Sequence, residues 1–318
     1  MTKKILVTGA AGQIGSELVP RLRELYGNEN VVASDISANP SEDLKNGTFI
    51  NIDVTNFNEI DAAIKKHNVG KIFHLSSILS SLGEQKPQLA YSVNFNGLYN
   101  ILEASRLNNV EKLIVPSSIA AFGPETPRVN TPNDTIQKPT TIYGISKVFG
   151  ELMGNYYFRK FGLDVRGVRF PGIISWKTEP TAGTTDYAVA IFYEAIRKNS
   201  YSCYLNSTTR LPMMYMPDAI KALVDLEKAD LKKLNRHAVF NVAAMSFTPE
   251  EIANEIKKKM PGFKITYEID ARRQAIADSW PESLDDSEAR KQWNWKPDWD
   301  IDGMTDSMLL NLRRKLTQ

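Results

Sequence analysis

A glycine-rich turn near the start of the chain constrains the fold more than any other feature. Residues 5–7 form a short apolar run, as expected of a strand buried on both faces. Gly9, Gly12 and Gly15 follow, and apolar residues then recur at helical spacing over residues 14–25. Glycines in such a strand-to-helix turn let the backbone approach a pyrophosphate, whose charge the amides of the helix N-terminus face. The turn therefore predicts a dinucleotide-binding site.

Predicted strands and helices alternate through the first half of the chain. Alternation of this kind is typical of a parallel sheet with helices on both faces. Further strands are predicted at 30–35, 48–53, 71–77, 112–118 and 164–170, and helices at 56–68, 88–107 and 143–161. We therefore predict an α/β fold: a doubly wound parallel sheet (Rossmann) with a smaller C-terminal α/β substrate-binding domain.

The pattern loosens beyond residue 171, which suggests a domain boundary. Residues 1–172 form the predicted NAD-binding Rossmann domain, to which the chain returns over about 205–245. Residues 173–318 form the predicted, mainly substrate-binding domain, in which Thr248 and Glu251 are spaced as a helix capping box. The proline-rich stretch 123–139 has no clear periodicity and is interpreted as a loop over the cleft.

Asp35 indicates which dinucleotide is bound. It lies 20 residues beyond Gly15, at the end of the predicted strand 30–35. A carboxylate there can accept hydrogen bonds from both ribose hydroxyls and repels a 2′-phosphate, which favours NAD over NADP. An aspartate that only caps a turn or a helix is the alternative.

Composition excludes several classes of function. The net charge of +2 shows no electrostatic footprint for nucleic acid or membrane. No apolar run approaches the ~18 residues that span a bilayer, and the first residues lack a signal-peptide core, so we expect a cytoplasmic protein. Cys203 is the only cysteine, and His67, His74 and His237 lie far apart, so neither a disulfide nor a metal site is expected.

Three side chains carry the predicted reaction: Ser118, Tyr143 and Lys147. Residues i and i+4 share a helix face, so Lys147 is expected beside Tyr143. A phenol with a pKa near ~10 is a poor base at neutral pH, but a neighbouring ammonium favours the phenolate. The tyrosinate could take the proton of a substrate hydroxyl while the adjacent carbon loses hydride to the nicotinamide, with Ser118 bonded to the same oxygen. Ser117 is the alternative for the serine role.

These motifs resemble those of a known family. Thr8-Gly-x-x-Gly12-x-x-Gly15, Asp53-Val54, Ser118 and Tyr143-x-x-x-Lys147 are together similar to the extended short-chain dehydrogenase/reductase family, over essentially the whole chain. Residues 78–80 with 83–84, 122–127, 179–187, 211–218 and 280–283 resemble its branch of L-threonine 3-dehydrogenases, which is related to UDP-galactose 4-epimerase. The resemblance implies oxidation of L-threonine at C3 to 2-amino-3-oxobutyrate, with hydride transfer to NAD.

The resemblance also implies which residues form the site. The cofactor would be held by Gly9, Gly12, Gln13, Ile14, Asp35, Asp53, Val54, Leu75, Ser76, Ser77, Asn94, Tyr143 and Lys147. The small-molecule substrate would be contacted by Ser80, Ser118, Tyr143, Thr184, Thr185 and Trp280. For the two threonines, capping of a helix before Asp186 is the alternative. A homodimer through the apolar faces of the predicted helices 88–107 and 143–161 is also implied.

Two other functions stay open on the sequence. An NAD-dependent nucleotide-sugar epimerase or dehydratase of the same family would keep the three reactive residues and use a larger cleft for a nucleotide diphosphate. A non-catalytic, NAD-sensing binding protein would be expected to lack the tyrosine or the lysine, and both are present. Turnover of L-threonine without turnover of UDP-sugars would distinguish the dehydrogenase from the epimerase.

Overall fold

The computed structural model describes residues 3–37, 40–181, 183–235 and 239–316, so His237 lies outside the described residues. The chain divides into two compact units. The first unit comprises Met1–Ala121, Thr140–Arg169 and Ile220–Phe240. The second unit comprises Phe122–Pro139, Phe170–Ala219 and Asn241–Gln318.

The first unit is built on a parallel sheet whose strand order reverses next to β1. The order is β11-β7-β5-β4-β1-β2-β3, with β6 paired to β7. The strands are β1 Lys4–Thr8, β2 Val31–Asp35, β3 Phe49–Asn51, β4 Val69–His74, β5 Lys112–Ile114, β6 Ser117–Ser118, β7 Asp164–Phe170 and β11 Val239–Asn241. Because β1 pairs in parallel with both β2 and β4, the doubly wound fold is confirmed. Sheets of this kind bind ligands beyond the carboxyl ends of the strands at such a switch point.

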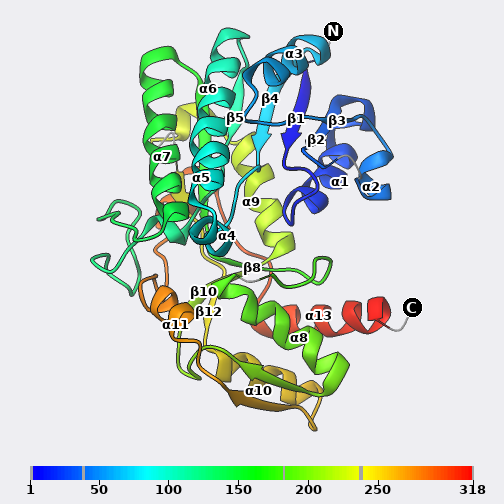
Figure 1. The fold of residues 1–318 in the computed structure, drawn as a ribbon, viewed down its shortest axis with the longest axis vertical. Coiled ribbons are helices and arrows are strands. Elements are labelled where there is room, and N and C mark those ends of the chain that lie inside the picture. Colours follow the sequence, from blue (N-terminus) through cyan, green and yellow to red (C-terminus); the bar gives the residue numbers. More distant parts are fainter. Residues whose placement is uncertain (1–2, 38–39, 182, 236–238, 317–318) are drawn as a thin grey trace. The chain divides into compact units, whose positions relative to one another are not determined.

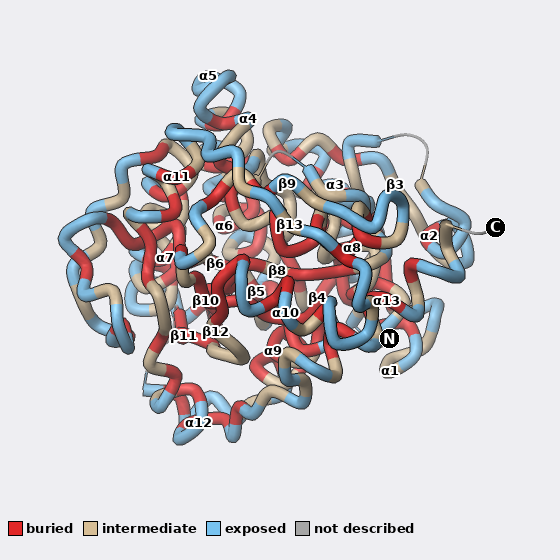
Figure 2. The backbone as a smooth tube through the Cα atoms, turned by 90° about the horizontal axis from the view of Figure 1, so that it is seen from below, coloured by how far each residue is buried: buried red, intermediate tan, exposed pale blue. Residues whose placement is uncertain are grey.

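Helices cover this sheet because their apolar faces are buried against it (Figure 1). They are α1 Gly15–Tyr26, α2 Glu42–Lys45, α3 Phe57–His67, α4 Ser80–Gln85, α5 Pro87–Ala90, α6 Leu98–Leu107, α7 Ile142–Phe161 and α9 Met216–Lys228. Ile60 of α3, Ile101 of α6 and Tyr157 of α7 share one core cluster with Leu6 of β1. Figure 2 shows β4 and β5 buried, whereas α5 is largely exposed. Helix α1 continues unbroken through Pro20.

The predicted helix 88–107 is interrupted in the structure. Residues Tyr91–Gly97 between α5 and α6 are π-helical. From this turn the Asn94 amide binds the backbone of Ile78, accepting from its N–H at 2.7 Å and donating to its carbonyl at 2.9 Å. A π-turn changes no apolar periodicity strongly enough to be read from sequence, and such turns occur frequently at functional sites.

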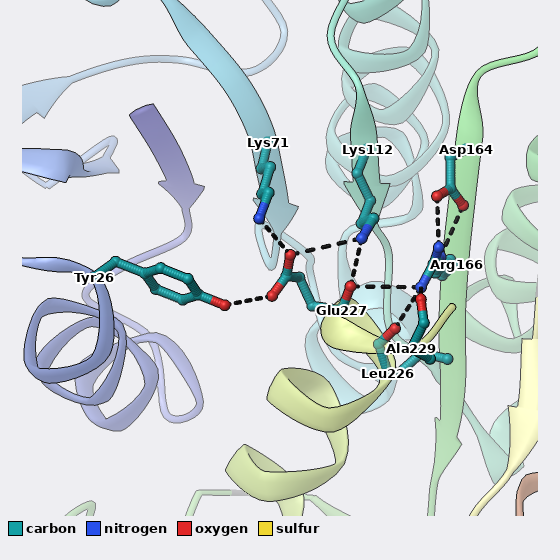
Figure 3. Close-up of polar contacts among 8 residues, drawn as sticks. All are labelled: Tyr26, Lys71, Lys112, Asp164, Arg166, Leu226, Glu227 and Ala229. Carbon is teal, nitrogen blue, oxygen red and sulfur yellow. Dashed lines mark hydrogen bonds and ion pairs between the residues drawn. The ribbon is translucent and has the colours of Figure 1, made fainter. Parts of the chain in front are cut away.

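The end of α9 is held at the amino edge of the sheet by buried charges (Figure 3). The carboxylate of Glu227 lies 2.6 Å from Lys71 Nζ and 3.6 Å from Lys112 Nζ, and it accepts the Tyr26 hydroxyl at 2.5 Å. Lys71 and Lys112 stand near the starts of β4 and β5, so the cluster lies away from the carboxyl ends of the strands.

Arg166 of β7 completes this cluster. Its guanidinium binds Asp164 at 2.8 and 2.7 Å and donates to the carbonyls of Leu226 and Ala229, each at 2.7 Å. Carbonyls at a helix C-terminus lack intrahelical partners, so the arginine satisfies them. We call Tyr26, Lys71, Lys112, Asp164, Arg166 and Glu227 the amino-edge cluster.

The second unit contains two small sheets and five further α-helices among its described residues. A three-stranded sheet has the order β12-β10-β8, and β9 pairs in parallel with β13. The elements are β8 Gly172–Ile174, α8 Tyr187–Lys198, β9 Ser200–Cys203, β10 Leu211–Tyr215, β12 Met245–Phe247, α10 Pro249–Lys259, β13 Lys264–Tyr267, α11 Ala271–Asp278, α12 Ser287–Trp293 and α13 Ile301–Leu316. The predicted capping box is confirmed, because Thr248 and Glu251 each bind the other's backbone N–H.

Segment Phe122–Pro139 belongs to the second unit, although the sequence placed it in the first predicted domain. The reason is backbone pairing over a long sequence separation. Thr131 N–H donates to the carbonyl of Ser283 at 2.9 Å, and the N–H of Asp285 donates to Thr131 at 3.0 Å. The segment has no helix or strand, as expected of a loop, and only its assignment to the first predicted domain differs from the structure. The roles of the two units in binding cofactor and substrate stay predictions.

No helix within the described ranges is long and apolar enough to cross a membrane. Likewise, the described residues contain no group of three or more His, Cys, Asp or Glu side chains placed to hold a metal ion. Cys203 is buried and forms no disulfide.

Candidate active site

The glycine turn after β1 leaves no room for side chains at two of its three glycines. Gly9 has a φ of +70°, and a Cβ there would lie 2.6 Å from the backbone nitrogen of Ser76. A Cβ on Gly15 would lie 2.3 Å from the Gly9 carbonyl oxygen. At Gly12, which is exposed, an added Cβ would meet a single neighbour, the Gly9 oxygen at 3.2 Å. The turn is thus packed on its inner side and open at Gly12, as a cradle for a pyrophosphate requires.

Asp35 supports this turn as well as ending β2. Its Oδ2 accepts from the N–H of Ala11 at 2.9 Å, and its Oδ1 accepts from the N–H of Ser37 at 3.0 Å. The carboxylate therefore lies beside the glycine turn, which is the position that the ribose-binding prediction needs. The structure shows the contacts of the turn-capping alternative, while ribose binding stays a prediction.

The other residues predicted around the cofactor already have partners inside the protein. Asp53 Oδ1 accepts from the N–H and hydroxyl of Thr55, at 2.9 and 2.8 Å. Val54 is buried and lies where a Cβ on Gly97 would approach it to 2.9 Å. Their contact with an adenine stays a prediction, since their contacts in the structure are those of a turn and a core residue.

Asn94 organises the segment that follows β4. Besides Ile78, it accepts from the Ser77 hydroxyl at 3.3 Å and donates to the Ser146 hydroxyl at 3.3 Å. Ser80 is buried at the first turn of α4. Ser77, a predicted cofactor residue after β4, is therefore linked to α7 through the buried Asn94 amide.

Tyr143, Lys147 and Ser118 come together at the start of α7. Thr141 caps this helix by accepting from the N–H of Gly144 at 3.0 Å. The side chain of Ser118 interacts with the Tyr143 phenol and lowers its pKa. Lys147 Nζ lies 5.2 Å from the centre of the Tyr143 ring and donates to the Pro116 carbonyl at 3.1 Å. Ser118 thus interacts with the phenol while Ser117 binds Glu151, and the role of Ser118 in the reaction stays a prediction.

The electrostatics of this cluster differ from the expectation. Burial raises the pKa of Tyr143 to about 12, and the hydrogen bond to Ser118 offsets only part of that increase. Burial lowers the pKa of Lys147 to about 8, against an opposing effect of the Glu151 carboxylate. The net shift of the phenol pKa is therefore upward, opposite to the lowering expected from Lys147, because the loss of water around the phenol has the largest effect.

Sequence reasoning missed two charged residues beside this cluster, Glu151 and Arg169. Glu151 Oε1 accepts from the Ser117 hydroxyl at 2.5 Å and from Arg169 Nε at 2.9 Å, and its Oε2 accepts from Arg169 Nη2 at 2.7 Å. A signal was available: Glu151 stands four residues beyond Lys147 on the same helix face, and Arg169 is a charge in a strand predicted to be buried.

A small polar cavity lies behind Lys147, with a volume of about 30 Å³. Its polar lining is formed by His74, Ser76, Ser77, Asn94, Ser117, Ser146, Lys147 and Glu151. His74 is buried and shares a 2.8 Å hydrogen bond with the Thr8 hydroxyl. Burial, with a smaller effect of Lys147, lowers the pKa of His74 to about 3, so the ring is neutral at physiological pH.

The second unit contains three of the predicted substrate residues, Thr184, Thr185 and Trp280. Thr184 is buried, and the Tyr204 hydroxyl donates to the carbonyl of Gly183 at 2.9 Å. Asp186 accepts from the N–H and the hydroxyl of Thr181, both at 2.6 Å, so it does not cap α8 through its side chain. Trp280 is buried, and its carbonyl accepts from Arg128 Nε at 3.3 Å.

Comparison with known proteins identifies the family. An L-threonine dehydrogenase from Clostridium difficile is 51% identical, with 98% of each chain covered and a TM-score of 0.96. A GalE-like L-threonine dehydrogenase from Cupriavidus necator, in its holo form, is 46% identical, with 97% of this chain and 99% of that one covered and a TM-score of 0.95. An uncharacterized epimerase/dehydratase of Staphylococcus haemolyticus is 49% identical over 98% of both chains.

The sequence model of the "NAD dependent epimerase/dehydratase family" matches residues 5–243. The glycine turn, the doubly wound sheet and these relatives confirm the extended short-chain dehydrogenase/reductase resemblance, and NAD is the cofactor. The chain is thus a member of the NAD-dependent epimerase/dehydratase family.

Proposed function

We propose that this chain is an L-threonine 3-dehydrogenase, which oxidises L-threonine at C3 to 2-amino-3-oxobutyrate. The observation that carries the proposal is that Ser118, Tyr143 and Lys147 come together at one site, in a chain 46–51% identical to solved L-threonine dehydrogenases. A serine hydroxyl and a phenol that lie close together can both bond to one substrate oxygen placed between them.

Each of the three side chains has a separate role in the proposed reaction. Ser118 holds the substrate 3-hydroxyl in line with Tyr143. Tyr143 accepts the proton of that hydroxyl as general base. Lys147, as an ammonium, stabilises the phenolate that Tyr143 must become. Bound NAD supplies the hydride acceptor and a positively charged ring that also favours the phenolate.

The glycine turn and Asp35 are the proposed core of the NAD site. Gly9, Gly12, Gln13 and Ile14 would hold the pyrophosphate through backbone amides at the start of α1. Asp35 would bind the ribose hydroxyls. The further proposed contacts are Asp53, Val54, Leu75, Ser76, Ser77, Asn94, Tyr143 and Lys147.

The proposed substrate contacts hold the amino and carboxylate groups of threonine. The hydroxyls of Ser80, Thr184 and Thr185 can serve as donors to the carboxylate and as acceptors for the ammonium. Trp280 would close the pocket. These assignments rest on the positions that match the resemblance.

The test is NADH formation by the purified protein with L-threonine, L-serine, 3-hydroxybutyrate and UDP-galactose. Rapid turnover of L-threonine alone supports the proposal. Turnover of a UDP-sugar with L-threonine inert would favour the alternative, a nucleotide-sugar epimerase or dehydratase, which the names of the family and of the Staphylococcus relative keep open.

We also propose a homodimer. Large apolar side chains are exposed on α6 and α7, namely Tyr99, Leu107, Ile145, Leu152 and Tyr156. Leu152 is 63% exposed, which is costly for an isolated surface and typical of one that another subunit covers. Light scattering should give a dimer mass for the wild type and a monomer mass for Leu152→Glu. A wild-type monomer at micromolar concentration would contradict the proposal.

A further inference from the structure

Glu151 forms a buried ion pair at the end of β7 that the proposed reaction does not use directly. Its side chain is 7% exposed and that of Arg169 is 6% exposed. The guanidinium binds both carboxylate oxygens, through Nε at 2.9 Å and Nη2 at 2.7 Å. A buried pair of this kind seldom adds net stability, since apolar residues of the same volume would serve as well. Its presence beside a reactive cluster therefore suggests another role.

The first link from Glu151 to the site runs through Ser117. The Ser117 hydroxyl donates to Glu151 Oε1 at 2.5 Å, across 34 residues of sequence. Ser117 and Ser118 are the two residues of β6, and Ser118 interacts with the Tyr143 phenol and lowers its pKa. A contact that fixes Ser117 therefore also limits the movement of the neighbouring serine.

The second link from Glu151 runs to Lys147. Both side chains come from one face of α7, four residues apart, and both line the 30 Å³ cavity. A polar cavity of this size exceeds the ~10–15 Å³ that one water molecule needs, so the two groups can interact across a water as well as directly. Charge on Glu151 favours the ammonium form of Lys147, against the burial that opposes it.

Titratable groups from several elements lie around Lys147 and Glu151. Tyr143 lies beside Lys147 on α7, His74 of β4 lines the same cavity, and Arg169 of β7 binds Glu151. His74 is neutral and Arg169 is positive, so Glu151 is the one negative group in this set. Removing its charge would leave Lys147 without this neighbouring carboxylate.

We propose that Glu151 is a positioning residue: oriented by Arg169, it keeps Lys147 in the charged form and holds the Ser117–Ser118 strand against α7. The catalytic consequence rests on the proposed dehydrogenase function, but the coupling between Glu151 and Lys147 is a property of the cofactor-free chain.

The test compares the two carboxylates that pair with arginines of β7, Glu151 and Asp164. Glu151→Gln removes the charge while keeping the shape. Asp164→Asn does the same for the Asp164–Arg166 pair, which is buried at the other end of β7. The pKa of Lys147 is measured by NMR of [ε-¹³C]lysine-labelled, cofactor-free protein, with Lys147→Met identifying the signal.

The expected result is a fall in the Lys147 pKa by about one unit or more in Glu151→Gln, as for the loss of a close opposite charge, and no change in Asp164→Asn. The kcat of Glu151→Gln for threonine oxidation should be about threefold below that of wild type near pH 7.5 and about tenfold below it above pH 9. Once the pH exceeds the Lys147 pKa of both proteins, a pKa lowered by one unit reduces the charged fraction of Lys147 about tenfold. The KM for threonine should change less than kcat.

An unchanged Lys147 pKa in folded Glu151→Gln overturns the proposal, as does an equal change in Asp164→Asn. If Glu151→Gln does not fold, Glu151→Asp keeps the charge one methylene farther away and should lower the pKa by less; no shift there also overturns it. If the Lys147 pKa falls in Glu151→Gln but the wild-type protein does not oxidise threonine, the coupling is supported and the proposed function is rejected. Failure of the further inference and failure of the proposed function are therefore distinguishable.

Discussion

Two arginines of β7, one near each end of the strand, form buried ion pairs with carboxylates. Asp164–Arg166 belongs to the amino-edge cluster, and Glu151–Arg169 lies beside Ser117 at the carboxyl edge. The bond lengths are nearly the same, with an Nη2–carboxylate distance of 2.7 Å in both pairs. The pairs differ in what surrounds them.

At the amino edge the charges neutralise one another and satisfy the end of a helix. Arg166 binds carbonyls at the end of α9, and the Glu227 carboxylate forms ion pairs with the two lysines of β4 and β5 (Figure 3). At the carboxyl edge, a serine and a cavity border the pair, and a lysine lines the same cavity. The same chemical pair thus satisfies the end of a helix at one edge and is available to tune reactive groups at the other.

The largest expected effect breaks the amino-edge pair. Arg166→Met leaves Asp164 and the α9 carbonyls without their donor, so the free energy of unfolding should fall by about 3–5 kcal/mol. Urea unfolding measures it, with Arg21→Met as control, since the exposed Arg21–Glu24 pair should contribute less than about 1 kcal/mol. The kcat of folded Arg166→Met should stay within about twofold of wild type. A comparable loss in both variants would contradict the structural role.

The next effect compares two tyrosine hydroxyls, one at each edge. Tyr143→Phe removes the proposed base and should lower kcat for threonine oxidation by about 10²-fold or more, the scale of positioned acid–base catalysis. Tyr26→Phe removes the hydroxyl that binds Glu227 and should leave kcat within about twofold. Steady-state kinetics at saturating NAD decides. Unchanged activity in Tyr143→Phe would reject the tyrosinate mechanism.

A third prediction concerns pH at the carboxyl edge. Folding lowers the pKa of His74 to about 3, so the unfolded chain takes up its proton first as pH falls below about 6.5. Stability should therefore be lost over the window from about 6.5 to 3, by about 2 kcal/mol between pH 7.5 and pH 5 from this group. His74→Gln should reduce that loss in urea unfolding, whereas His67→Gln, at a partly exposed helix position, should change it much less.

The smallest effect concerns cofactor choice. Asp35→Ala should weaken NAD binding by about tenfold, since a charged acceptor of two ribose hydroxyls is lost. NADP binding should weaken less, because the repulsion of its 2′-phosphate is lost as well. Calorimetry on the cofactor-free protein measures both, and Asp164→Asn should leave them unchanged. Equal losses for NAD and NADP would mean that Asp35 acts only by supporting the turn through Ala11.

Features that depend on residues close together in the sequence were predicted, whereas features that depend on distant residues were not. The strand 164–170 was predicted at its observed bounds, and the helix carrying Tyr143 and Lys147 within one residue of its start. The π-turn at Asn94 and the assignment of 122–139 to the second unit were not, because both depend on partners far away in sequence. The bond between Ser117 and Glu151 likewise joins residues that are 34 positions apart.

The amino-acid sequence by itself determined the doubly wound sheet, the open glycine turn and the Tyr143–Lys147 spacing, because each of these follows from short-range periodicity and backbone freedom. Only the tertiary structure decided that Glu151 binds Ser117 and Arg169, and that burial raises the phenol pKa more than Ser118 lowers it. The physical reason is that desolvation and buried ion pairs depend on what surrounds a group in three dimensions, which no local spacing records.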